Sequence, residues 1–172
     1  MKVRRTGTVM RRLPRAAVLG LAVGAALTLL AGPAASSGAE VTRGDFHAFA
    51  VATGSELSIG GHAQMVRTAD GKTKVSIQVT GLAPDATYGS HVHAGSCATN
   101  ETGGGHYFFG GSVPDGDGPG ANEIWPGPVT ANGGGVGKGK TTVGATAGPD
   151  AMSVVIHRSG AAPNKIACAD LT

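Results

Sequence analysis

The sequence predicts an all-β domain, a sandwich or a barrel, and three observations lead to this prediction. Short runs rich in β-branched residues recur along the chain, and turn-forming residues, among them many of the 30 glycines and 9 prolines, separate these runs. No long stretch shows the 3.6-residue repeat of apolar residues that marks an amphipathic helix. The chain has 172 residues, which suits one such domain once a targeting segment is removed.

Residues 1–39 read as a cleavable secretion signal. They begin with six Lys and Arg residues, continue with the apolar run 16–32, and end in small residues where a peptidase can cut after Ala34 or Ala39. The apolar run is short for a bilayer span and contains glycines, so a membrane anchor is the less favoured alternative. We therefore expect a secreted, periplasmic or cell-surface protein, without stable membrane insertion, whose exported domain covers residues 40–172.

Removal of the signal reverses the sign of the net charge. Six of the 14 basic residues and none of the 11 acidic residues lie in residues 1–39, so the exported domain carries a net charge of −3. Its basic residues do not cluster with aromatic residues along the sequence. Binding to nucleic acid is therefore not expected.

Seven segments of the exported domain are expected to form strands. The clearest is 73–80, where Val75, Ile77 and Val79 alternate with polar residues. The preceding residues 69–72 (ADGK) predict a hairpin, because Asp-Gly suits a turn with positive φ. The expected strands cover residues 45–52, 61–68, 73–80, 88–93, 123–130, 136–143 and 152–157.

Residues 94–122 form a long segment rich in glycine and proline, and such a loop in a small domain is usually functional or disordered. Asp115 and Asp117 in this segment are expected to form turns. Cys97 and Cys168 are the two cysteines of the chain. Export favours a disulfide between them over two free thiols, and closing a loop of about 70 residues would stabilise the fold by roughly 4 kcal/mol.

Four histidines have the placement of a metal site. His91 and His93 are separated by one residue in an expected strand, so their side chains lie on the same face. His106 follows three glycines in the long loop, and His157 ends an apolar run. Four imidazoles suit copper, and also zinc or nickel. Taken alone, the His-x-His pair is equally compatible with two surface histidines.

These segments resemble the Cu/Zn superoxide dismutases over about residues 60–171. GL at 81–82 and YGSHVH at 88–93, followed by Cys97, resemble the family's strand of two copper histidines and the cysteine of its intrachain bridge. GGHY at 104–107 resembles the segment of the histidine that bridges copper and zinc, and SVVIH at 153–157 resembles the strand of the last copper histidine. KIAC at 165–168 resembles the C-terminal segment in which an arginine guides superoxide.

The resemblance implies an eight-stranded Greek-key β-barrel or sandwich with immunoglobulin-like architecture. It implies an extracytoplasmic enzyme that converts superoxide, its small-molecule partner, to oxygen and hydrogen peroxide. His106 would also carry a proton, and Lys165 would attract the anion. The copper ligands implied by the family pattern are His91, His93, His106 and His157.

Three departures from the family pattern modify this expectation. Residues 107–156 contain no histidine, so the zinc ligands are missing and zinc binding is doubtful. Only the seven residues 158–164 separate His157 from Lys165, so the copper should be open to solvent. Lys165 stands where the family has its guiding arginine, which keeps the charge but loses the planar fork and predicts reduced activity. This pattern resembles the copper-only members of the family.

Without zinc, the second ring nitrogen of His106 needs another partner, and carboxylates commonly orient metal-binding histidines. Glu123 is the candidate, with a solvated strand end as the alternative. His47 and His62 lack ligand-spaced neighbours and are expected to be structural or solvated.

Two other functions stay open: a copper-buffering protein without turnover, and a β-sandwich adhesion or ligand-binding module with incidental histidines. The oligomeric state is open, with a monomer favoured.

Overall fold

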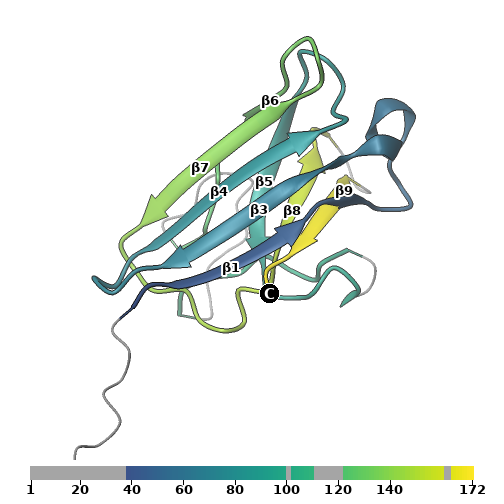
Figure 1. Ribbon diagram of the computed structural model, residues 1–172. Coiled ribbons are helices and arrows are strands. Elements are labelled where there is room, and N and C mark those ends of the chain that lie inside the picture. The colour runs from purple at the N-terminus through teal and green to yellow at the C-terminus, as the bar shows by residue number, and fades with distance from the viewer. Residues whose placement is uncertain (1–37, 100–101, 111–121, 161–163) are drawn as a thin grey trace, which may run out of the picture. The chain divides into compact units, whose positions relative to one another are not determined.

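Two antiparallel β-sheets face each other in the computed structural model (Figure 1). The structure describes residues 38–99, 102–110, 122–160 and 164–172, which belong to the compact unit Ser36–Thr172. The predicted secretion signal lies outside the described residues, apart from residues 38–39, and so do Asp115 and Asp117. Within the described ranges, no helix has the length and apolar character needed to cross a membrane.

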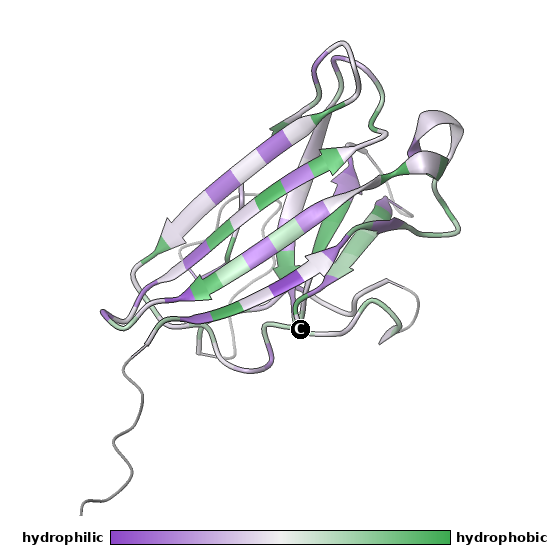
Figure 2. Ribbon diagram, in the orientation of Figure 1, coloured by the Kyte–Doolittle hydropathy of each residue, from purple (hydrophilic) through white to green (hydrophobic). Residues whose placement is uncertain are grey.

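One sheet has four strands in the order β1-β3-β4-β7. The predicted hairpin joins β3 to β4, with Arg67 opposite Thr73 and Gly71 at a φ of 78° in the turn. Along β4, buried and exposed residues alternate as predicted (Figure 2). The strands are β1 (Glu40–Asp45), β3 (Gly60–Arg67), β4 (Thr73–Thr80) and β7 (Gly137–Val143).

The other sheet has five strands in the order β2-β9-β8-β5-β6. Its inner face shares the main core with the first sheet through Val92, Val154 and Ile156. Its outer face carries a second apolar cluster of Phe49, Cys97, Val155 and Cys168. The strands are β2 (His47–Ala48), β9 (Lys165–Asp170), β8 (Ser153–Arg158), β5 (Thr87–His93) and β6 (Val129–Thr130).

The predicted all-β sandwich is confirmed. The number of strands depends on whether β1 and β2 are counted as two strands or as one bent strand. Only Phe46 separates β1 from β2, although the two strands belong to different sheets. The N-terminal strand therefore crosses from one sheet to the other at this buried residue. When β1 and β2 are counted as one bent strand, the described residues form the eight strands that the family pattern implies.

Two expected strands differ from the structure, and β9 forms where no strand was expected. The expected strand 45–52 starts earlier, at Glu40, and stops at Ala48, after which the 3-10 helix η1 (Gly54–Ser58) follows. The expected strand 123–130 is reduced to Val129–Thr130, because Pro126 and Pro128 cannot donate to a strand ladder. β9 has weak β-forming composition (KIACAD), and it forms a strand because it lies between β2 and β8.

Candidate metal centre

Three of the four predicted histidines come from the outer face of the five-stranded sheet. Along β5, Val92 points into the main core, so His91 and His93 share the opposite face. His157 on β8 lies opposite Gly89 of β5, in register with the same face. His91 is 6% exposed and His93 is fully buried. The predicted projection of the His-x-His pair to one face is therefore observed.

A glycine turn brings His106 over this face. Gly103 and Gly104 both have positive φ values, 73° and 69°, which side chains rarely tolerate. A Cβ on Gly103 would also lie 2.7 Å from Val155 Cγ2, so the turn packs directly on the sheet. Backbone hydrogen bonds then hold the segment to β5, with Ala94 N donating to Gly105 O at 2.9 Å. As a result, His106 pairs with His93 in an isolated β-bridge.

The Cys97–Cys168 disulfide fixes the start of this loop to β9, with a Cα–Cα distance of 5.7 Å. Both cysteines are buried, and they pack with Val155 and Phe49 on the outer face of the sheet. Ser153 adds a hydrogen bond from its hydroxyl to Gly95 O at 2.7 Å. The loop is thus attached to both β8 and β9.

The four imidazole rings converge. Every pair of their ring centroids lies between 4.0 and 6.5 Å apart. His91, His106 and His157 each offer a nitrogen, and these three atoms lie within 4.8 Å of one another. His93 joins them through a 3.1 Å contact between its Nε2 and His157 Nε2. This cluster can hold a metal ion.

Glu123 contacts two of these rings at once. Its Oε2 lies 3.2 Å from His91 Nδ1, and its Oε1 lies 3.3 Å from His106 Nδ1. The carboxylate is buried, with the residue 5% exposed, which excludes the alternative of a solvated strand end. An isolated β-bridge between Phe108 and Glu123 sets its position. A carboxylate that accepts both Nδ1–H groups leaves Nε2 of each ring as the nitrogen with a free lone pair.

The carbonyl oxygen of Gly104 contacts both the ring of His93 and the ammonium group of Lys165. It lies 3.1 Å from His93 Nδ1, and it accepts a hydrogen bond from Lys165 Nζ at 2.5 Å. Lys165 lies on β9 directly opposite His157 on β8. The predicted site residues of β5, β8, β9 and the loop are therefore gathered in one place.

Burial and neighbouring charge favour the neutral form of His91, His93 and His157. Burial, with His106 and other neighbours adding to it, lowers the pKa of His91 to about 3 and that of His157 to about 4. Burial likewise lowers the pKa of His93 to about 2, and it lowers the pKa of Lys165. Neutral imidazole is the form that ligates metals. The all-nitrogen donor set fits copper, and it also fits zinc.

An open cleft of about 550 Å³ leads to the rings and includes His91, His106, His157 and Lys165 in its wall. Trp125 also lines it, with its ring centroid 4.3 Å from that of His91. Trp125 was not among the predicted site residues, although it is the only tryptophan of the chain and stands two residues after Glu123. It places a fluorescent side chain directly beside the candidate metal site.

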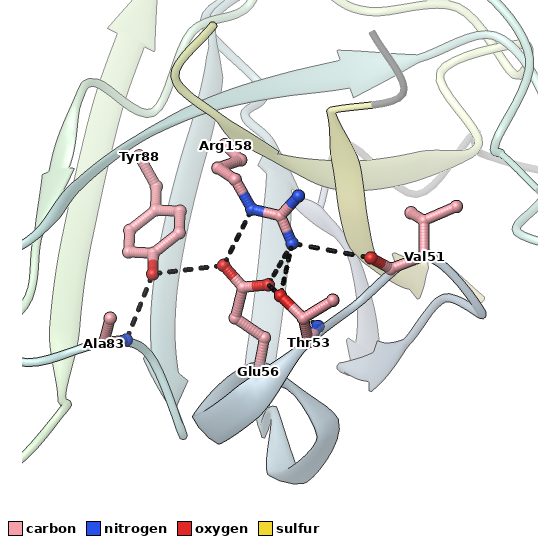
Figure 3. A network of polar contacts seen from close by, with 6 residues as sticks. All are labelled: Val51, Thr53, Glu56, Ala83, Tyr88 and Arg158. Carbon is pink, nitrogen blue, oxygen red and sulfur yellow. Dashed lines mark hydrogen bonds and ion pairs between the residues drawn. The ribbon is translucent and has the colours of Figure 1, made fainter.

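A second polar network reaches the same cleft (Figure 3). Arg158, which follows His157, donates from Nε to Glu56 Oε1 at 3.1 Å and pairs with Oε2 through Nη2. Glu56 also accepts from Thr53 N at 3.1 Å and from the Tyr88 hydroxyl at 3.4 Å. The pair of Glu56 and Arg158 was not predicted from the sequence, although Thr53-x-x-Glu56 is a capping-box pattern. Glu56 offsets the charge of Arg158, whereas Lys165 has no carboxylate partner among the described residues.

His47 and His62 are exposed and lie outside the cluster, as expected.

No family model matches the sequence, and no curated protein matches it. Among solved structures, the chain is similar to a double mutant of a superoxide dismutase-like (SOD-like) protein from Bacillus subtilis. The TM-score is 0.53 at 18% identity, over 75% of this chain and 95% of that chain. At this identity the similarity shows an SOD-like fold.

Proposed function

We propose that this protein is a copper-dependent superoxide dismutase that acts outside the cytoplasm. The observation that carries the proposal is the convergence of four imidazoles under an open cleft that also contains a cation. The SOD-like fold supports it. Three of the rings come from β5 and β8, the two strands whose sequences resemble the family's copper-ligand strands. His91, His93, His106 and His157 would hold the metal.

Copper bound by these residues would supply one-electron chemistry, in which one superoxide is oxidised and a second is reduced. The protein prepares the ligands for this metal. Gly104 O accepts the Nδ1–H of His93, and Glu123 accepts those of His91 and His106, so the tautomer of each ring presents Nε2. Glu123 would thereby orient His106 without zinc.

His106 and Lys165 would act on the substrate side. The side chain of His106 is 22% exposed, against 7% for His91, so its Nε2 can exchange a proton with solvent. That proton would be delivered to the reduced substrate. The ammonium of Lys165 would attract superoxide into the cleft by charge, without the two-point contact that an arginine gives.

One observation favours a second function, copper buffering without turnover. The hydrogen bond from Lys165 Nζ to Gly104 O ties the cation to the backbone and lowers its availability to an anion. In that case the histidines would bind copper equally well, while superoxide would not be drawn to it. The two functions therefore differ in turnover and agree in metal binding.

The test measures copper binding and superoxide consumption on the same protein. Copper(II) should quench the fluorescence of Trp125, and metal analysis should find one copper per chain. Wild-type protein loaded with copper should consume superoxide, with or without added zinc. His157→Ala should lose copper affinity, whereas the exposed His62→Ala should keep it. Copper binding without turnover would select the buffering function, and a folded, oxidised wild type that binds no copper would refute both.

A further inference from the structure

The ring of His157 differs from the other three rings of the candidate metal site in how it is held. Each of the other three has an Nδ1 partner from outside the cluster, either Glu123 or the carbonyl of Gly104. For His157, the shortest hydrogen-bonding contact among the described residues is 3.1 Å long and joins it to His93, which is itself a candidate ligand. The direction of the His157 ring must therefore depend more on its backbone.

The backbone at His157 is irregular. The pairing of β8 with β9 shifts register between Ile156 and His157. Irregularities of this kind re-aim the side chains beside them. The side chain of Asn164 also acts on the ring, but Asn164 hydrogen bonds to Gly160 within the same connection between the two strands. Because β8 ends at Arg158, one residue after His157, the ring lies at a strand end that needs a further attachment.

The side chain of Arg158 provides this attachment (Figure 3). Its Nε donates to Glu56 Oε1 at 3.1 Å, and its Nη2 donates to Glu56 Oε2. Nη2 also donates to Thr53 Oγ1 at 3.3 Å and to Val51 O at 3.5 Å. These acceptors lie in η1 and in the segment directly before it. The end of β8 is thus attached to a part of the chain about 100 residues away in sequence.

Glu56 is held in place from several sides. It is 5% exposed, and it accepts hydrogen bonds from Thr53 N at 3.1 Å and from the Tyr88 hydroxyl at 3.4 Å. Tyr88 lies directly opposite Arg158 on β5. A planar guanidinium that contacts both oxygens of a fixed carboxylate has a defined direction as well as a favourable charge.

We propose that Arg158 is a positioning residue of the metal centre, and that its two-point contact with Glu56 fixes the end of β8 and with it the ring of His157. The inference rests on the proposed function in one respect, that His157 binds copper. An ion pair that only stabilised the fold could stand at many places. This one directly follows a candidate ligand, and Arg158 lies in the wall of the same cleft.

The test compares the copper(II)-loaded wild type with Arg158→Lys, which keeps the charge but cannot make the two-point contact. Electron paramagnetic resonance and the ligand-field absorption of copper(II) report the geometry of the ligands, and both spectra should change. Copper affinity, measured in competition with a chelator, should fall about tenfold. Glu56→Gln should change the spectra in the same way. The double variant should resemble either single variant, because both substitutions remove the same contact.

The matched control is Arg67→Lys. Arg67 is the last residue of β3, as Arg158 is the last residue of β8. Its guanidinium likewise contacts a carboxylate, that of Glu40, and it donates to the carbonyls of Ala147 and Gly148. Arg67→Lys should lower stability in urea but keep the copper spectra and the copper affinity of the wild type.

Unchanged spectra and affinity in folded Arg158→Lys would overturn the inference and leave the proposed copper site standing. An equal spectral change in Arg67→Lys would also overturn it, because loss of stability would then explain the change. Circular dichroism verifies that each variant is folded, and Glu56→Gln carries the test if Arg158→Lys does not fold. A wild type that takes up no copper would refute the proposed function and this inference together, so the two failures are distinguishable.

Discussion

Each sheet packs one face against the shared core, but the two sheets differ in what covers the other, outer face. The four-stranded sheet is called here the open sheet and the five-stranded sheet the covered sheet. In the four-stranded sheet, β4 alternates buried and exposed residues, and its outer face is open to solvent. In the five-stranded sheet, the first four residues of β8 and the middle four of β9 are all buried. The difference shows that the candidate site needs both the sheet and the loop that covers it, since this loop supplies His106 and Glu123.

Removal of the disulfide should have the largest effect on stability, and it should act first on the five-stranded sheet and the loop that covers it. Cys97→Ala with Cys168→Ala frees a closed loop with a sequence separation of 71, which should lower the free energy of unfolding by about 4 kcal/mol. Urea denaturation measures this change. Hydrogen exchange should accelerate first in the loop residues 94–99 and 102–110, and only later in β4. If hydrogen exchange accelerated in both sheets at the same time, the disulfide would not stabilise the five-stranded sheet and its loop selectively.

Truncation of a core residue of the open sheet should be the next largest effect, and it should leave the metal centre intact. Ile77→Ala removes a side chain that is 4% exposed, which should cost about 3 kcal/mol of unfolding free energy. Copper affinity, measured by quenching of Trp125 in competition with a chelator, should not change. A parallel loss of copper affinity would mean that the two sheets are coupled through the core.

Glu123→Gln should produce the converse result, a weaker metal site on a nearly unchanged fold. The variant keeps the shape of the side chain but removes the charge shared by His91 and His106. Copper affinity should fall by about 10- to 100-fold. The control is Glu40→Gln, a carboxylate of the open sheet whose side chain is 65% exposed and which should leave copper affinity unchanged. Equal effects of both substitutions would indicate general electrostatics instead of ligand orientation.

The smallest effect is expected at the pair of Glu56 and Arg158, at the margin of the covered sheet. The hydrogen bond from Arg158 lowers the pKa of Glu56 below its ordinary value of 4.5. The carboxylate therefore stabilises the fold above pH 4.5 and loses this contribution as the pH falls through its lowered pKa. Glu56→Gln should cost about 1 kcal/mol at pH 7, and the difference from wild type should shrink in acid. Thermal unfolding at pH 7 and pH 3 measures it, and a constant difference would contradict the assignment.

Sequence patterns predicted the open sheet better than the covered one. Strand 73–80 and the Asp-Gly turn follow from alternation and turn chemistry, which are local. The switch at Phe46, the short β6 and the weakly β-forming β9 depend on partners far along the chain, so local patterns could not place them. Wherever the choice between helix, strand and loop depended on distant pairing, periodicity carried no signal.

The histidines of the candidate metal site could be predicted from the sequence, but most of the residues around them could not. Strand geometry placed His91 and His93 on one face, and His106 and His157 were candidates from their positions in the sequence. The family resemblance then implied all four as copper ligands. Glu123 was expected beside His106, but its simultaneous contact with His91 requires both ends of a loop to fold over the same strand. Trp125 and Arg158 approach the site only through tertiary packing, and neither stands in a metal-binding pattern.

The shared carbonyl of Gly104 has a consequence for how this site can change over time. One peptide group anchors the ring of His93 and the ammonium of Lys165, so a rotation of that peptide would alter ligand and charge together. The left-handed backbone at Gly104 makes almost any replacement there strained. A substitution at Gly104 should therefore displace the ring of His93 and the ammonium of Lys165 together.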